Sequence, residues 1–179
     1  TCQVGTEDAL RNCGRVMQET GAQGVKLEGA GEETLAAVRA LVRCGIPVMG
    51  HLGFTPQSVH APGGSGVQGR EADPASRLLA EARALEEAGV FSIVLELLPA
   101  DVARRVTEAV GVPTIGIGAG AGCDGQVLVL PDLLGLNEGF APKFLKRYAE
   151  LGAQARDAIR RFGGEVRSGA YPDDAHCFC

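Results

Sequence analysis

The chain has 179 residues, of which 45% are hydrophobic and 22% are charged, so it can bury a substantial core and does not have the composition of a disordered protein. Its formal net charge is −5, and its one dense basic cluster lies at 143–147, which argues against nucleic-acid binding and favours a small-molecule partner. No leader-like start and no bilayer-length apolar run are present, so we expect a soluble protein that does not associate with membranes. Six cysteines without a C-x-x-C pair favour reduced thiols and a cytoplasmic location.

Helical and extended segments alternate along the chain. Apolar residues at helical spacing, with Thr6 and Asp73 as N-cap candidates, predict helices over 6–20, 32–44, 73–88, 99–110 and 142–166, the last interrupted near Gly152 and Gly163. Short apolar runs between them predict strands over 24–29, 48–52, 92–97, 114–117 and 126–130.

This alternation predicts an α/β fold, because parallel strands need helical crossovers. Five strands fit either an open doubly wound sheet or part of a (β/α)8 barrel, and a complete barrel usually needs about 250 residues. The first predicted helix has no strand before it. We therefore expect residues 1–179 to form a single domain that is an incomplete barrel. This domain would be the C-terminal portion of a (β/α)8 barrel, without the strands that precede it.

A long polar, glycine-rich loop follows the second predicted strand and extends to Arg70. Loops of this length are uncommon in compact domains and are often functional. His51 lies where the strand gives way to the loop, so we expect the segment 47–70 to form one wall of an active site. His60, within the loop, is expected to be exposed or to face a partner.

Polar residues in the strands cluster toward the carboxyl ends, where α/β proteins build their sites. Lys26 and Glu28 alternate and so share a face, and the alternative to a functional role is a strand-end ion pair. Glu96, flanked by leucines, would lose hydration and suits a general base, although it could equally bind a helix N-terminus. A lone strand histidine such as His51 is more often structural than a metal ligand.

The glycine-rich turn at 116–122 imitates a phosphate loop. Its spacing is not G-x-G-x-x-G and no helix start follows promptly, which argues against a dinucleotide site. We expect these glycines to let the backbone pass close to a ligand.

Several segments together resemble the ketopantoate hydroxymethyltransferase family, and the resemblance runs through nearly the whole chain. The segments that carry it are Val25-Lys-Leu-Glu-Gly, Gly50-His-Leu-Gly-Phe-Thr-Pro-Gln-Ser-Val, Val67-Gln-Gly-Arg, Ile93-Val-Leu-Glu, Pro113-Thr-Ile-Gly-Ile-Gly-Ala-Gly, Cys123-Asp-Gly-Gln-Val-Leu-Val and Pro142-Lys-Phe.

The resemblance implies a (β/α)8 TIM barrel of the phosphoenolpyruvate/pyruvate-like type that usually forms a homodecamer. It implies transfer of a hydroxymethyl group from 5,10-methylenetetrahydrofolate to 3-methyl-2-oxobutanoate with Mg²⁺, giving 2-dehydropantoate in pantothenate biosynthesis. By position, Glu96 matches the proton acceptor, Glu28 a metal ligand, Lys26 a lysine that contacts the ketoacid, and His51 an active-site histidine expected to help bind substrate.

The sequence departs from the family pattern at its start. The family's Gly-Asp-Ser segment and a second strand-end aspartate precede the region where Thr1 aligns, so half of the implied metal site is missing and we expect the isolated chain to be inactive. Ala30 and the segment 64–66 also differ from the usual family residues. The alternatives are a carbon–carbon lyase of the same superfamily and an inactive fragment that acts only in assembly.

Overall fold

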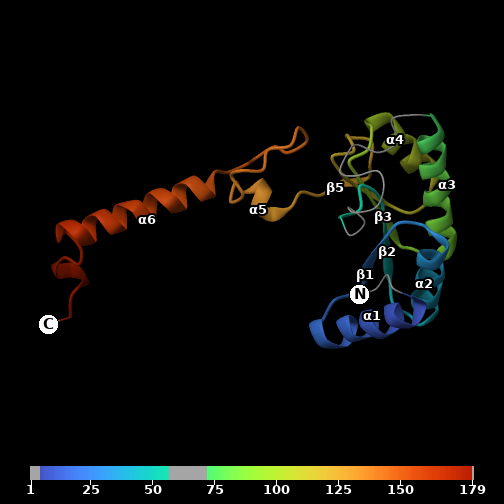
Figure 1. The fold of residues 1–179 in the computed structure, drawn as a ribbon, viewed down its shortest axis with the longest axis horizontal. Coiled ribbons are helices and arrows are strands. Elements are labelled where there is room, and N and C mark those ends of the chain that lie inside the picture. The colour runs from blue at the N-terminus through green and yellow to red at the C-terminus, as the bar shows by residue number, and fades with distance from the viewer. Residues whose placement is uncertain (1–4, 57–71, 179) are drawn as a thin grey trace. The chain divides into compact units, whose positions relative to one another are not determined.

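The computed structural model describes residues 5–56 and 72–178 (Figure 1). Most of the predicted loop 47–70, including His60, therefore lies outside the described residues. The chain divides into two compact units, residues 1–127 and 128–179, and each is described by itself. The expectation that residues 1–179 form one domain stays a prediction.

The first unit is built on one parallel sheet. Its strands are β1 (Val25–Glu28), β2 (Val48–Gly53), β3 (Ser92–Glu96), β4 (Thr114–Ile117) and β5 (Gly125–Gln126). Their order in the sheet is the order of the chain, β1-β2-β3-β4-β5, and every neighbouring pair is parallel. A doubly wound sheet would reverse direction at a switch point, whereas the wall of a barrel keeps chain order.

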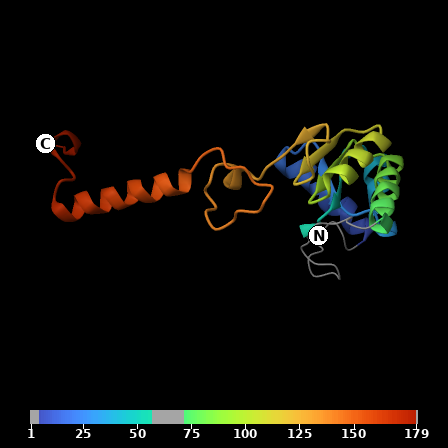
Figure 2. The same ribbon diagram turned by 90° about the horizontal axis from the view of Figure 1, so that it is seen from above.

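Four helices cover one face of this sheet. They are α1 (Thr6–Thr20), α2 (Glu32–Arg43), α3 (Ala72–Ala88) and α4 (Ala100–Ala109). Each helix packs against the next, and Figures 1 and 2 show α2, α3 and α4 along one side of the strands, with α1 at the end of this layer against α2. The core between these layers contains Leu27, Leu52 and Leu95 from alternate strand positions. The α/β prediction is confirmed: the unit is one arc of a (β/α)8 barrel, and the described residues supply five of the eight strands that a closed barrel contains.

The second unit contains α5 (Leu130–Leu133), α6 (Leu151–Ser168) and the short 3₁₀ helix η2 (Asp174–His176). The helix α6 has no buried residue and ends at Ser168. The next residue, Gly169, takes the left-handed conformation typical of a helix C-terminus. No helix of the described residues is long and apolar enough to cross a membrane.

Several predicted boundaries were wrong. The strand predicted over 126–130 is reduced to Gly125–Gln126, because the pairing with β4 ends where the Val127 amide donates to the Gly116 carbonyl. The last long helix begins at Leu151 rather than at Pro142, and it runs through Gly163 without interruption.

Two predicted helix caps were also wrong. The N-cap of α1 is Gly5, so Thr6 is already helical. The helix α3 begins at Ala72, which places Asp73 inside the first turn.

Candidate active site

The four predicted site residues lie on the face of the sheet that the helices do not cover. Glu28 is the register partner of His51, and Glu96 lies two residues beyond Val94, the partner of His51 on the next strand. In-register neighbours of parallel strands and alternate residues of one strand share a face, so Lys26 belongs to the same group. The predicted convergence of these side chains is therefore present in the structure.

His51 is the centre of the cluster. Its Nδ1 lies 3.0 Å from Lys26 Nζ and 3.8 Å from Glu28 Oε1, and its Nε2 lies 3.0 Å from Glu96 Oε2. Lys26 Nζ is also 3.7 Å from Glu28 Oε1. One imidazole ring thus connects the base candidate on β3 with the lysine and the carboxylate on β1.

The contact with Lys26 determines which ring nitrogen of His51 carries a proton. An ammonium group can only donate, so Nδ1 accepts from Lys26 and the ring proton of the neutral imidazole resides on Nε2, beside Glu96. The Nε2 to Oε2 approach is close in distance, but its geometry is not that of a hydrogen bond. The interaction of His51 with Glu96 is therefore a close electrostatic contact across the strand ends.

The exposure of these side chains differs in a way that suits chemistry on a small molecule. Glu28 and His51 are buried, with exposed side-chain fractions of 5% and 3%, whereas Glu96 retains 17% and Lys26 retains 42%. A ligand on this face can therefore reach the Glu96 carboxylate and the Lys26 amine, while His51 and Glu28 form the floor beneath them.

The backbone beside Glu96 has an unusual conformation. Leu97 has φ of 52°, and it is the one residue other than glycine with a positive φ among residues 5–56 and 72–178. A left-handed conformation costs a side-chain-bearing residue roughly 1–2 kcal/mol. Such conformations persist where the surrounding structure imposes them, and they cluster at functional sites.

The Mg²⁺ that the resemblance implies finds few ligands among these residues. No group of three or more His, Cys, Asp or Glu side chains that could hold a metal ion occurs in the described parts of the chain. Glu28 supplies one buried carboxylate, but Mg²⁺ sites commonly need more oxygen ligands than this. The described residues therefore do not form a magnesium site by themselves.

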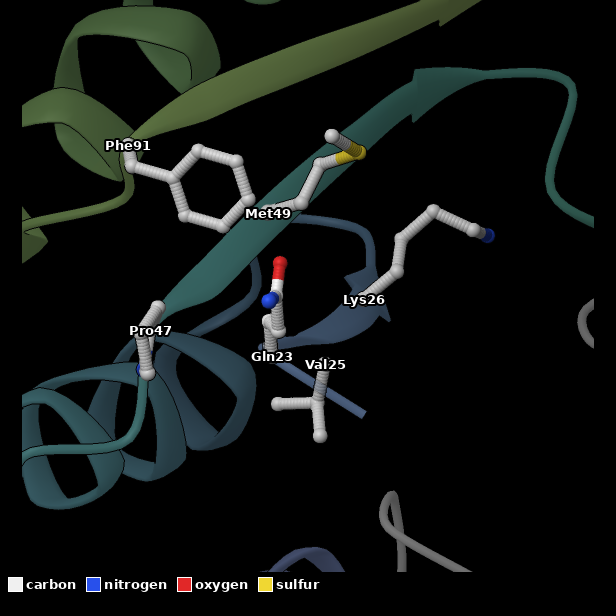
Figure 3. A pocket seen from close by; sticks show the side chains of 7 residues that line it. Gln23, Val25, Lys26, Pro47, Met49 and Phe91 are labelled. Atoms are coloured by element: carbon white, nitrogen blue, oxygen red, sulfur yellow. The ribbon is translucent and has the colours of Figure 1, made fainter. Parts of the chain in front are cut away.

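A pocket of about 420 Å³ opens at the amino-terminal ends of the strands. It is lined by Gln23, Gly24, Val25, Lys26, Pro47, Met49 and Phe91. Figure 3 shows the Phe91 ring near Met49, with the Lys26 amine directed away from Phe91. Only Lys26 connects this largely apolar hollow with the cluster around His51, so the candidate chemistry lies at the carboxyl ends of the strands.

The glycines of the predicted ligand loop have another role in the structure. A Cβ at Gly120 would lie 2.4 Å from Ala100 Cβ, and one at Gly122 would lie 2.8 Å from Arg104 Cβ. Their lack of a side chain lets the loop approach α4. We expected these glycines to let the backbone pass close to a ligand, and in the structure they let it pass close to a helix.

Comparison with known proteins provides independent information about the family. The family model described as "Ketopantoate hydroxymethyltransferase" matches residues 1–174. The chain belongs to this family. The hydroxymethyltransferase resemblance inferred from the sequence motifs is thus confirmed.

Relatives within the ketopantoate hydroxymethyltransferase family are similar over nearly all of the chain. A protein of Trichlorobacter lovleyi named 3-methyl-2-oxobutanoate hydroxymethyltransferase is 53% identical over 177 residues, which are 99% of this chain and 66% of that protein. A protein of the same name from Nitratidesulfovibrio vulgaris is 57% identical over 178 residues, which are 99% of this chain and 58% of that protein. The chain thus spans about three fifths of the length of these relatives.

Solved structures with a similar arrangement are more distant. A putative phosphonomutase from Burkholderia cenocepacia has a TM-score of 0.49 at 18% identity, with 92% of this chain and 66% of that chain covered. A putative lyase/mutase from the same organism has a TM-score of 0.47 at 20% identity, with 94% and 58% covered. Neither likeness is strong enough to support a conclusion about this chain.

Gly53 and Leu97, which adjoin the site, are not among the residues predicted from the sequence. For Leu97 there was no sequence signal, since leucine is not a residue that prefers a left-handed conformation. Gly53 had a weak one: a glycine at a strand end often marks a close backbone approach.

Proposed function

We propose that this chain is the part of a 3-methyl-2-oxobutanoate hydroxymethyltransferase that carries the catalytic base. The observation that supports this most directly is the line of Lys26, His51 and Glu96, with successive contacts of 3.0 Å, on the open face of a sheet from this family. This places an accessible carboxylate and an accessible cation on either side of a buried imidazole.

In the proposed reaction, Glu96 removes the proton from C3 of 3-methyl-2-oxobutanoate as a general base. The electrons of the C–H bond form an enolate, and Lys26 offsets the negative charge of the substrate. The enolate carbon then forms a bond to the one-carbon unit of 5,10-methylenetetrahydrofolate, whose two C–N bonds break so that tetrahydrofolate leaves. A water molecule supplies the hydroxyl oxygen of the new hydroxymethyl group, and the two folate nitrogens and that hydroxyl take up the protons of the water and the proton held by Glu96. His51 contacts both Lys26 and Glu96 and would contribute to the shape and charge of the substrate site.

Other parts of the proposal rest on the resemblance to the family alone. They are the use of Mg²⁺ with Glu28 as one ligand, the folate cosubstrate, the role in pantothenate biosynthesis, a homo-oligomeric state such as a decamer, and a cytoplasmic location. We derive no step of the reaction through the metal.

The substitution Glu96→Gln tests the proposed base. It is made in a protein restored to full length by joining this chain to the part of the Trichlorobacter lovleyi relative that the chain does not match. Because glutamine cannot accept the proton, exchange of the C3 hydrogen with D₂O, followed by NMR, should fall by about 10²-fold or more.

Glu87→Gln, an exposed glutamate on α3, is the matched control and should exchange at the unsubstituted rate. Exchange that survives in Glu96→Gln would show that Glu96 is not the base. Product formation without the folate would instead favour a carbon–carbon lyase.

A further inference from the structure

Two backbone hydrogen bonds hold the peptide group that joins Glu96 to Leu97, one at its carbonyl and one at its amide. The Glu96 carbonyl accepts from Phe54 N at 2.9 Å, and Leu97 N donates to the Ile117 carbonyl at 2.9 Å. The first bond attaches the end of β3 to the end of β2, and the second attaches it to the end of β4. Glu96 is therefore fixed between both neighbouring strands at the point where its side chain enters the site.

Gly53 makes the first of these attachments possible. Its φ is 96°, and a Cβ at this position would lie 2.1 Å from the Glu96 carbonyl oxygen and 3.0 Å from Leu98 Cδ2. Real Cβ atoms do not approach a backbone oxygen so closely, so any side chain at position 53 must push the end of β3 away from β2. Displacement of the Glu96 backbone would carry its carboxylate with it.

Leu97 completes the arrangement. Its left-handed conformation turns the chain sharply immediately after Glu96, and the next residue, Leu98, is 3% exposed in the core. The turn therefore fixes the backbone of Glu96 from the C-terminal side, as Gly53 does from the neighbouring strand. Together they hold the Glu96 carboxylate 3.0 Å from His51 Nε2.

We propose that Gly53 and the left-handed Leu97 form a backbone clamp that positions Glu96 for proton transfer. Neither is a catalytic residue, because both act through the Glu96 backbone. The proposal rests on the proposed function of Glu96 and adds two positioning residues to it. Small displacements of a reacting group can cost about 10²-fold in rate, so the clamp should affect turnover more than substrate affinity.

The first test compares Gly53→Ala with Gly45→Ala in the restored full-length protein. Gly45 also has a positive φ, 80°, but a Cβ there would meet no atom within 4 Å, so its substitution imposes the same conformational strain without the clash. We expect Gly53→Ala to lower kcat for C3 exchange about 10²-fold with little change in KM, and Gly45→Ala to leave both unchanged. Equal effects of the two substitutions on kcat would overturn the clamp.

A second pair of variants changes Leu97, the other residue of the clamp. This pair tests the clamp even if Gly53→Ala does not fold. Glycine adopts a positive φ freely, whereas a β-branched residue does so only with great strain. Leu97→Gly should therefore keep the exchange rate, and Leu97→Val should lose it. A loss in Leu97→Gly as large as that in Leu97→Val would overturn the role of the left-handed turn.

A crystal structure of Gly53→Ala separates failure of the clamp from failure of the proposed base. The clamp predicts that the distance from His51 Nε2 to Glu96 Oε2 increases from 3.0 Å, whichever residue removes the proton. An unchanged distance would overturn the clamp. Exchange that survives Glu96→Gln would instead overturn the proposed function.

Discussion

Glu81 is a carboxyl group whose environment in the fold differs from that in water. It lies on α3, and burial raises the pKa of this carboxyl, while the Arg77 guanidinium, 3.4 Å away, opposes the shift. Since the folded state holds the proton more tightly than the unfolded chain does, the stability associated with protonated Glu81 is present in acid and is lost as pH rises through the raised pKa. Ionised Glu81 is therefore unfavourable for the fold at neutral pH.

The substitution Glu81→Gln tests this effect. Below the unfolded pKa both side chains are neutral, so the free energies of unfolding should be similar. As pH rises to 7, the variant should become more stable than the unsubstituted chain, because glutamine cannot ionise. Urea unfolding at pH 4 and pH 7 measures the difference, with exposed Glu87→Gln as the matched control. A variant that is less stable at pH 7 would contradict the assignment.

At the same scale, the sequence predicted which residues meet in the site but not how they meet. Strand alternation and strand ends placed Lys26, Glu28, His51 and Glu96 on one edge and face, because a period of two residues depends on backbone geometry alone. The distances around His51 depend on rotamers and on the register between strands. The left-handed Leu97 depends on contacts from both neighbouring strands, so no local pattern could reveal it.

At the scale of elements, a polar clip holds the loop that joins β4 to β5. The Asp124 carboxylate accepts from Thr114 N at 2.8 Å and from Thr114 Oγ1 at 3.1 Å. Thr114 is fully buried, and its hydroxyl also lies 2.8 Å from Thr107 Oγ1 on α4. Thr114 thus connects the start of its strand to the following loop, through Asp124, and to α4, through Thr107.

Removal of this carboxylate should loosen the loop. Asp124→Ala leaves the buried Thr114 amide without its acceptor and removes one of the two partners of the Thr114 hydroxyl, so we expect the free energy of unfolding to fall by about 1–3 kcal/mol. Asp124→Asn is the matched control, because its amide oxygen can still accept from Thr114, so it should lose less. Thermal and urea unfolding measure both variants, and equal stability of Asp124→Ala and the unsubstituted chain would show that the clip is not stabilising.

The elements that were predicted correctly are those with a strong period and a packed face. The helices α1, α2, α3 and α4 all pack in a continuous layer, so the spacing of their apolar residues reports their structure. The segment after β5 was wrongly predicted to continue the strand. Its apolar side chains, Val127, Val129 and Leu130, are exposed. A run of apolar residues indicates a strand only where a neighbouring strand pairs with it.

At the scale of the whole molecule, two features indicate that the described residues form only part of a site and of a sheet: the one buried carboxylate of the site, Glu28, and an open sheet edge at β1. Glu28 is the site's proposed metal ligand, but the described residues offer no cluster that could hold a metal ion. The strand β1 pairs with β2 on one side only within the described part of the chain, and exposed strand edges promote aggregation. Both features are consistent with a chain that spans about three fifths of the length of its relatives.

We therefore expect the 179 residues alone to be inactive and the restored full-length protein to be active. Isothermal titration with MgCl₂ should give no saturable binding to the chain alone, because one carboxylate is too few ligands, and saturable binding to the restored protein. Glu28→Gln in the restored protein should weaken that binding, whereas Glu87→Gln should not. Saturable Mg²⁺ binding together with folate-dependent ketopantoate formation by the chain alone would contradict this prediction, because residues 1–179 would then suffice for the site.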